Sequence, residues 1–268
     1  MSYAEVIGDP IAQSKSPLIH RFWLDTLGLE ADYRATRVMP EDLPDYFAAR
    51  TADPEWRGCN ITVPHKVAAL ELVPDPGRLR DTIGAANTVF RNEAGEIAVT
   101  NTDAGGFWTP ISAVDLKDRP VAVIGAGGAA RAVLFALARM EVGPVTILNR
   151  SPLKAAGLLA RFGLKGDVRP LDARLPAAAL LVNASTLGMD GQPPLELDLS
   201  PLPEAALVYD LVYAPVQTAL LAAAEARGLD TIDGLEILVE QSAIAFELFF
   251  GLAPAREEDA RLRALLVR

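Results

Sequence analysis

Residues 121–132 read VAVIGAGGAARA, and the expected fold follows from this stretch. Its first five residues are apolar, which is typical of a strand buried in a parallel sheet. A glycine turn with the spacing G-x-G-x-x-A comes next, and a run with helical periodicity follows it. In such a unit the first glycine permits the tight turn, the second lets the backbone approach a pyrophosphate, and the small third residue lets helix and strand pack closely. We therefore expect a Rossmann-type dinucleotide site formed by Gly125, Ala126, Gly127, Gly128 and Ala129.

The residues after the next strand-like run, VTILN at 145–149, favour one of the two nicotinamide dinucleotides. An NAD site usually has an acidic residue at this point, which binds the ribose 2′-hydroxyl. This chain has Arg150 instead, a permanent cation suited to a 2′-phosphate, and Ser151 is expected to cap a helix that begins at Pro152. The alternative is that the cations here are ordinary solvated surface charges. We expect NADP as the cofactor, bound by Asn149, Arg150, Ser151 and Lys154.

Turn signals and hydrophobic runs alternate along the chain, which predicts an α/β fold with parallel sheet. Strands are expected at 3–7, 31–38, 60–63, 88–90, 97–100, 121–125, 145–149, 180–184 and 207–212. Helices are expected from Ser16 as N-cap, at 41–50, 64–72, 101–114, 216–227, 235–251 and 253–268, and between the later strands. We expect an open α/β domain at 1–102 and a Rossmann domain at 103–234, with the helices of 235–268 returning to the first domain.

The composition restricts the class of partner. The 268-residue chain has a formal net charge of −10, which argues against a nucleic acid or an anionic membrane because either needs a basic face. One cysteine excludes an intrachain disulfide, and with only two histidines it also excludes a Cys/His zinc cage, so no metal is expected. The first residues lack the pattern of a signal peptide and no apolar run is long enough to span a membrane, so we expect a cytoplasmic protein.

Polar residues gather at the ends of the expected strands in the first half of the chain. They are Ser14, Ser16, Asn60, Thr62, Lys66, Asn87 and Asp103. Each alone has an ordinary structural role, as a helix cap, a turn residue or a surface lysine. Together they favour a site for a small polyhydroxylated ligand, because ligands of open α/β sheets bind outside the carboxyl ends of the strands. Hydride transfer to a carbonyl also needs a proton donor, and without a metal a lysine with a tuned pKa can act as one.

Taken together, the sequence motifs of the chain resemble those of the shikimate dehydrogenase family. The matching stretches are GDPIAQSKSPLIH, NITVPHK, GAANTV, TNTDAGGF, GAGGAARA, NRS, VNASTLGM, YDLVYAP and DGLEILVEQ. They occur in family order from residue 8 to about 241, and so cover nearly the whole chain. The resemblance implies an N-terminal substrate domain joined to a C-terminal NADP-binding Rossmann domain, with the site in the cleft between them. It also implies reversible, NADPH-dependent reduction of 3-dehydroshikimate to shikimate, in aromatic amino acid (chorismate) biosynthesis.

The resemblance further implies a role for each matching residue. Lys66 and Asp103 would be the catalytic pair, and Ser14 and Ser16 would hold the substrate carboxylate. The other substrate contacts would come from Asn60, Thr62, Asn87, Tyr213 and Gln241, and the nicotinamide would lie near Gly234 and Ile237. His65 and His20 are expected to have structural roles.

A few positions depart from the family pattern. Gln13 stands where many members have histidine, Ile237 where methionine is common, and Ser185-Thr186 where Thr-Pro or Thr-Ser is frequent. None of these positions belongs to the expected catalytic pair.

Two alternatives to a biosynthetic shikimate dehydrogenase remain. A quinate/shikimate or amino-shikimate dehydrogenase would share the fold and the Lys66/Asp103 pair, but Ser14, Ser16 and Arg150 favour shikimate and NADP. A non-catalytic NADP-binding sensor would need no proton donor, so the presence of the pair argues against it. A monomer and a homodimer are both consistent with the sequence.

Overall fold

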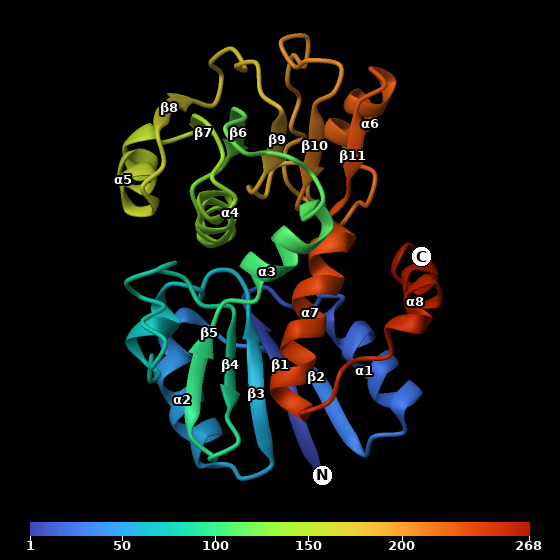
Figure 1. The fold of residues 1–268 in the computed structure, drawn as a ribbon. Coiled ribbons are helices and arrows are strands. Elements are labelled where there is room, and N and C mark those ends of the chain that lie inside the picture. The colour runs from blue at the N-terminus through green and yellow to red at the C-terminus, as the bar shows by residue number, and fades with distance from the viewer. The chain divides into compact units, whose positions relative to one another are not determined.

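The computed structural model describes residues 1–268, and the chain divides into two compact units. Unit 1 consists of Met1–Gly106 together with Val239–Arg268, and unit 2 is Phe107–Leu238. The chain leaves unit 1 within helix α3 (Asp103–Trp108) and returns to it within helix α7 (Gly234–Phe250), the long orange-red helix in Figure 1. Unit 1 is therefore assembled from two segments that are distant in sequence.

Unit 1 contains a five-stranded sheet with the order β2-β1-β3-β4-β5. Its strands are β1 (Ser2–Gly8), β2 (Ala31–Arg37), β3 (Trp56–Ile61), β4 (Thr88–Arg91) and β5 (Ile97–Thr100). The first three are parallel, whereas β4 is antiparallel to both β3 and β5. The hairpin predicted around Asn92–Gly95 is confirmed as the β4–β5 connection.

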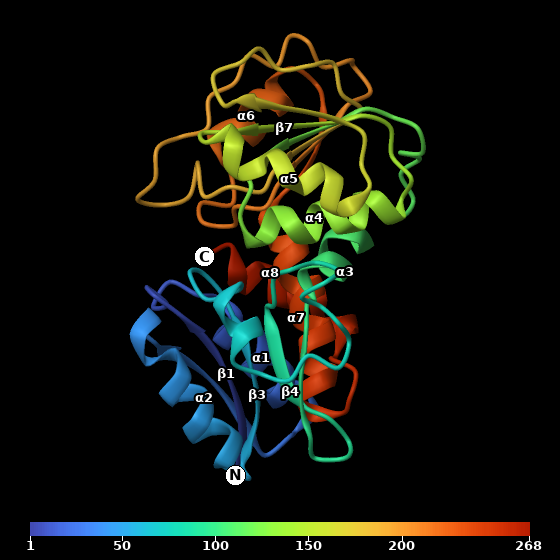
Figure 2. The ribbon, with the colours of Figure 1, turned by 90° about the vertical axis from the view of Figure 1, so that its left-hand side faces the viewer.

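Helices cover both faces of this sheet. Helix α2 (Leu43–Ala52) lies on one face, and α1 (Ser16–Leu27) and α7 lie on the other (Figures 1 and 2). Strand alternation explains the division, because successive side chains point to opposite faces. Glu5 faces α2, where it accepts hydrogen bonds from Tyr46 and Arg50. Tyr33 on β2 faces the other way and stacks on His20 of α1.

Three short 3₁₀ helices and a last α-helix complete unit 1. The 3₁₀ helices are η1 (Pro40–Asp42), η2 (Ala68–Glu71) and η4 (Arg256–Glu258), and the last helix is α8 (Asp259–Leu266). The helix predicted over 64–72 is wrong, because only η2 forms and the residues before it make turns. The helix predicted over 253–268 is shorter than expected, since Pro254 is followed by η4 before α8 begins.

Unit 2 contains a six-stranded parallel sheet with the order β11-β10-β9-β6-β7-β8. Its strands are β6 (Val121–Ile124), β7 (Val145–Asn149), β8 (Gly166–Pro170), β9 (Leu180–Asn183), β10 (Leu207–Asp210) and β11 (Asp230–Ile232). The chain runs outward from β6 to β8 and then crosses back to β9, beside β6. This reversal of direction makes the carboxyl ends of β6 and β9 the switch point of a doubly wound Rossmann sheet, so the predicted fold class is confirmed.

Each face of this sheet has its own apolar core. Helices α4 (Gly128–Arg139) and α5 (Pro152–Phe162) cover one face, and α6 (Ala219–Ala226) covers the other (Figure 2). The four central strands are buried on both sides, which explains the continuous apolar runs in their sequences. The remaining 3₁₀ helix, η3 (Thr109–Ile111), follows α3. No helix is both long and apolar enough to cross a membrane.

Three details of unit 2 differ from the sequence prediction. The helix expected between β9 and β10 is wrong, because residues 184–206 form turns and loops. That segment contains four prolines, at 193, 194, 201 and 203, which remove helix donors. Strands β8 and β11 were not predicted. β8 is an edge strand that carries charged residues, and β11 has only three residues, so neither gives a clear hydrophobic signal.

Candidate active site

One edge of the unit 1 sheet carries most of the predicted substrate residues. The register pairs Asn60 with Thr88, and Thr88 with Thr100. The end of β3, the start of β4 and the end of β5 therefore lie at the same edge, where β1 also ends. The segments next to these strand ends carry Lys66, Asn87 and Asp103, which explains how side chains far apart in sequence come together.

The Lys66 ammonium and the Asp103 carboxylate form an ion pair. The distance from Nζ to Oδ2 is 2.5 Å, and the two side chains are 16% and 10% exposed. The pair is therefore shielded from solvent yet still reachable. Lys66 lies in the turn after β3, while Asp103 is the first residue of α3. An ammonium has three protons, so Lys66 retains two donors for a ligand when one is engaged by the carboxylate.

Asn87 fixes the second oxygen of the same carboxylate. Its Nδ2 donates to Asp103 Oδ1 at 2.8 Å and to Thr102 Oγ1 at 2.9 Å, and lies 3.3 Å from Gln241 Oε1. Its Oδ1 accepts from the Thr102 backbone N–H at 2.6 Å. Gln241 comes from α7, in the second segment of unit 1. Both Asp103 oxygens thus have donors, and the carboxylate is held in one orientation toward Lys66.

Asn60 is buried in β3 beside this cluster. Its Oδ1 accepts from the Tyr33 hydroxyl at 2.6 Å, and its Nδ2 donates to Thr88 Oγ1 at 3.0 Å. Thr88 Oγ1 in turn lies 3.1 Å from Asn87 Oδ1. A continuous network of hydrogen bonds therefore runs from Tyr33 through Asn60 and Asn87 to the ion pair.

The serine-rich loop after β1 meets the same region. Ser16 is the first residue of α1 and Lys15 holds the N-cap position, so the prediction of Ser16 as the N-cap is wrong. Ser14 Oγ instead accepts from the Ser16 backbone N–H at 3.3 Å. The Ser16 side chain is buried. Lys15 Nζ donates to the Leu266 carbonyl and so ties the loop to α8.

Thr62 directly follows β3, and its methyl group packs against Gly8. The two histidines have structural contacts. His65 is buried with a ring nitrogen 2.8 Å from the Val38 carbonyl, which anchors the turn that carries Lys66. His20 is buried within an aromatic cluster, and burial lowers its pKa to about 3, so its ring is neutral at ordinary pH.

Three of the predicted site residues in unit 2 lie outside its glycine turn and the turn after β7. Tyr213 follows β10 and is half-buried, and burial raises the pKa of its hydroxyl. Gly234 begins α7, and a Cβ there would lie 2.4 Å from the Val212 carbonyl, so close packing of the helix on the segment after β10 already requires this glycine. Ile237 is buried in the core on the α4/α5 face. For these last two, packing within unit 2 accounts for the residue type.

The glycine turn of unit 2 fits a bound pyrophosphate. Gly125 has φ +105°, and a Cβ would lie 3.0 Å from the Ala184 carbonyl oxygen, so the turn after β6 packs on the loop after β9. Gly127 is different, because a Cβ there would meet no atom of the protein within 4 Å. The fold would therefore admit a side chain at this position, which leaves close approach of a ligand as the reason for glycine.

Helix α4 supplies donors at the same point. Its first internal hydrogen bond joins the Arg131 N–H to the Gly127 carbonyl. The N–H groups of Gly128, Ala129 and Ala130 precede this bond and remain for an anionic group.

The turn after β7 provides the other half of the predicted cofactor site. Asn149 Nδ2 donates to the Ser151 carbonyl at 2.9 Å and holds the turn closed. Ser151 is the N-cap of α5 with Pro152 at N1, as predicted, but its side chain makes no capping hydrogen bond. Arg150 and Lys154 are both exposed. An exposed cation beside free helix N–H groups suits a phosphate, and no carboxylate replaces it at this point of the chain.

Sequence reasoning missed three residues of the unit 1 network. Thr88 links Asn60 to Asn87, and its place in the GAANTV motif was an available signal. Thr102 bonds Asn87 and, through Oγ1, Gln241 Oε1 at 3.2 Å, and the TNTDAGGF motif contains it. Tyr33 gave no such signal, because it lies in a strand without a motif and its partners are on other elements.

Two family models match the chain. The description "Shikimate dehydrogenase substrate binding domain" matches residues 6–89, and "Shikimate / quinate 5-dehydrogenase" matches residues 110–186. A curated protein from Sphingopyxis alaskensis named shikimate dehydrogenase (NADP(+)) is 67% identical over 265 residues, which span 99% of this chain and 97% of that protein. The chain belongs to the shikimate dehydrogenase family.

Solved structures of the family show the same architecture. Shikimate 5-dehydrogenase from Thermus thermophilus, in complex with NADP(H) and shikimate, aligns with a TM-score of 0.86 at 39% identity and covers 99% of this chain and 100% of its own. Quinate dehydrogenase from Corynebacterium glutamicum, in complex with NAD, aligns with the same TM-score at 30% identity, over 98% of this chain and 99% of its own. Because one fold serves both enzymes, substrate and cofactor choice must depend on individual side chains.

Proposed function

We propose that this protein is an NADP-dependent shikimate dehydrogenase, which interconverts 3-dehydroshikimate and shikimate in aromatic amino acid biosynthesis. Membership of the family and the 67% identity to a curated shikimate dehydrogenase (NADP(+)) support this proposal. The Lys66–Asp103 ion pair is the observation that carries it, because it supplies a proton donor and an oriented carboxylate at the polar sheet edge. The single buried cysteine supports a reducing cytoplasmic location.

We assign substrate binding to unit 1 and NADP binding to unit 2. In unit 1, Ser14 and Ser16 bind the substrate carboxylate, and the ring hydroxyls contact Asn60, Thr62, Asn87 and Gln241. In unit 2, the turn at Gly125–Ala129 binds the pyrophosphate. The 2′-phosphate is bound by Asn149, Arg150, Ser151 and Lys154, and Tyr213 contributes to the substrate side.

Residues of the chain itself donate and accept the proton. NADP, held by the turns at Gly125–Ala129 and Asn149–Lys154, would supply the hydride acceptor in the oxidative direction and, as NADPH, the hydride donor in the reductive direction. In the reductive direction the Lys66 ammonium hydrogen-bonds the carbonyl oxygen, stabilises the negative charge that develops there, and transfers a proton to it. Asp103, fixed by Asn87, keeps the ammonium in position. In the oxidative direction Lys66 receives the hydroxyl proton.

The nearest alternative is a quinate/shikimate or amino-shikimate dehydrogenase. It would use the same ion pair, and a quinate dehydrogenase shares the fold at 30% identity. The presence of Arg150 without a carboxylate favours NADP and therefore the biosynthetic enzyme. A non-catalytic NADP sensor is disfavoured, because an oriented lysine–carboxylate pair has no use in it.

The test is an initial-rate assay with shikimate and quinate, each combined with NADP and NAD, followed by the absorbance of the reduced cofactor. We expect the highest kcat/KM with shikimate and NADP. Equal or higher values with quinate or NAD would contradict the assignment of substrate or cofactor. No turnover in any combination would contradict dehydrogenase activity on these substrates.

A further inference from the structure

Tyr33 is a buried residue that is hydrogen-bonded to one of the proposed substrate contacts, Asn60. It lies on the edge strand β2, and its register partner on β1 is Ala4, whose small side chain leaves room for the phenol to reach β3. The ring is fully buried and stacks on His20 with a centroid distance of 3.9 Å and parallel planes. The hydroxyl is therefore held at a fixed point inside unit 1.

The Tyr33 hydroxyl donates its single proton to Asn60 Oδ1 at 2.6 Å. This bond decides what Asn60 can offer to a ligand. Oδ1 is occupied by Tyr33, so the amide cannot turn without losing a short buried hydrogen bond. One Nδ2 proton goes to Thr88 Oγ1 at 3.0 Å, and the other has only a long contact of 3.5 Å to the Asn87 carbonyl. Asn60 is thus fixed with a weakly engaged N–H donor, which suits a substrate hydroxyl acting as acceptor.

We propose that Tyr33 is a positioning residue for the substrate, which holds Asn60 as a hydrogen-bond donor to a ring hydroxyl. This inference rests on the proposed function of the unit 1 site. It assigns Tyr33 no contact with the substrate, and its effect is transmitted through Asn60. Preorganisation of this kind lowers the cost of fixing side chains on binding.

Tyr33→Phe tests the proposal, because it removes the hydroxyl and keeps the ring on His20. We expect KM for shikimate to rise about tenfold, KM for NADP to change less than about twofold, and kcat to fall less than KM rises. In an Asn60→Ala background the same substitution should add less than about twofold, because its target is gone. Thermal unfolding of each variant reports whether it is folded at the assay temperature.

Tyr46→Phe is the matched control. Tyr46 is another buried tyrosine of unit 1, and its hydroxyl bonds Glu5 at 2.9 Å on the α2 face, away from every proposed substrate contact. We expect it to lower the melting temperature without raising KM. An unchanged KM in Tyr33→Phe, an equal rise in Tyr46→Phe, or full additivity with Asn60→Ala would each overturn the proposal. Absence of wild-type turnover in the same assay would instead overturn the proposed function, and this inference with it.

Discussion

The Lys66 ammonium lies 2.5 Å from an Asp103 carboxylate whose other oxygen accepts a hydrogen bond from Asn87. The carboxylate is therefore held by Asn87 and the ammonium by Asp103, and both of these residues are buried. A carboxylate fixed at both oxygens cannot turn away from the lysine. The lysine in turn keeps protons for a ligand at a constant position. This arrangement orients the two charged residues relative to each other, as their proposed acid–base role requires.

Removal of either member of the pair should lower turnover. We expect Lys66→Met and Asp103→Asn each to reduce kcat by about 10²–10⁴-fold, the usual range for a lost general acid–base group. Initial rates with shikimate and NADP measure the effect. The matched control is Lys117→Met, which breaks an exposed Lys–Glu pair in unit 2 with a similar distance of 2.7 Å to Glu141. Near-normal kcat in both site variants would refute the assignment of the pair.

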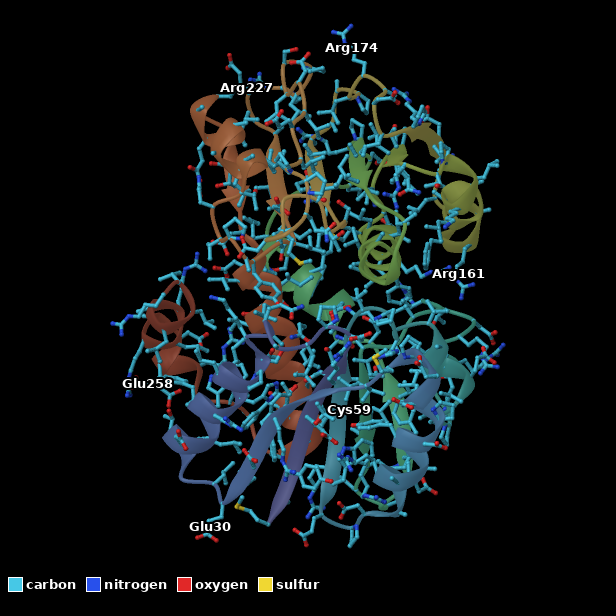
Figure 3. The ribbon with its side chains drawn as sticks, turned by 180° about the vertical axis from the view of Figure 1, so that it is seen from behind. Glu30, Cys59, Arg161, Arg174, Arg227 and Glu258 are labelled. Atoms are coloured by element: carbon cyan, nitrogen blue, oxygen red, sulfur yellow. The ribbon has the colours of Figure 1, made fainter.

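Arg150 should discriminate between the two cofactors. Its guanidinium is exposed beside the N-terminus of α5, where the 2′-phosphate of NADP but not the 2′-hydroxyl of NAD can use the charge. We expect Arg150→Ala to raise KM for NADP about tenfold or more and to leave KM for NAD nearly unchanged. The control is Arg174→Ala, an exposed arginine on the loop after β8 at the outer edge of unit 2 (Figure 3). An equal effect on both cofactors would mean that Arg150 does not recognise the 2′-phosphate.

Ser16→Ala should weaken substrate binding without the stability loss of a missing helix cap. We expect KM for shikimate to rise, because the hydroxyl proposed to bind the carboxylate is gone. A genuine cap is Thr218, whose side chain accepts from the Leu221 N–H at the start of α6, so Thr218→Ala should cost about 1–2 kcal/mol of unfolding free energy. Urea unfolding compares the two variants. A loss for Ser16→Ala as large as that for Thr218→Ala, with unchanged KM, would contradict the prediction.

His20 should make the protein less stable in mild acid. Burial lowers its pKa to about 3 in the folded protein, against 6.5 for an exposed histidine. The unfolded chain therefore binds a proton as the pH falls below 6.5, while the folded protein does not until about pH 3, so acid favours unfolding throughout this window. Between pH 7 and pH 5 this one group should cost about 2 kcal/mol.

His20→Phe separates this effect from other titrations, because phenylalanine can keep the stack on Tyr33. Urea unfolding at pH 7 and at pH 5 should show a smaller loss of stability for the variant than for the wild type. The same loss in both proteins would show that His20 does not remain neutral when folded.

The main strands and helices could be predicted from the sequence, but the exact first residue of a helix and the shortest strand could not. The strand at 121–125 and the glycine turn after it were predictable, because a buried parallel strand and a phosphate-binding turn each demand particular residue types. The start of α1 was misplaced by one residue, since serine before proline fits both the N-cap and the first helical position. The short β11 was missed because pairing with β10, rather than its own sequence, makes it a strand.

In the candidate site, too, local sequence motifs identify some residues, whereas contacts between distant parts of the chain could not be predicted. Lys66, Asn87 and Asp103 lie in motifs at strand ends, and the structure brings them into one hydrogen-bonded cluster. The link from Tyr33 to Asn60 was not predictable, because it joins two strands across a third and depends on the small Ala4 between them. Buried hydrogen bonds between distant residues depend on sheet order and register, which no local pattern encodes.

The two-segment construction of unit 1 has a consequence for how the protein is made. Synthesis from the N-terminus completes unit 2 when Leu238 has been added, whereas unit 1 still lacks Val239–Arg268. That last segment contains Gln241, which bonds Asn87, and Leu266, which anchors Lys15. Unit 2 can therefore fold during translation, but the contacts around the ion pair must wait for the end of the chain. A chain that is stopped early would carry a folded unit 2 and an unfinished unit 1.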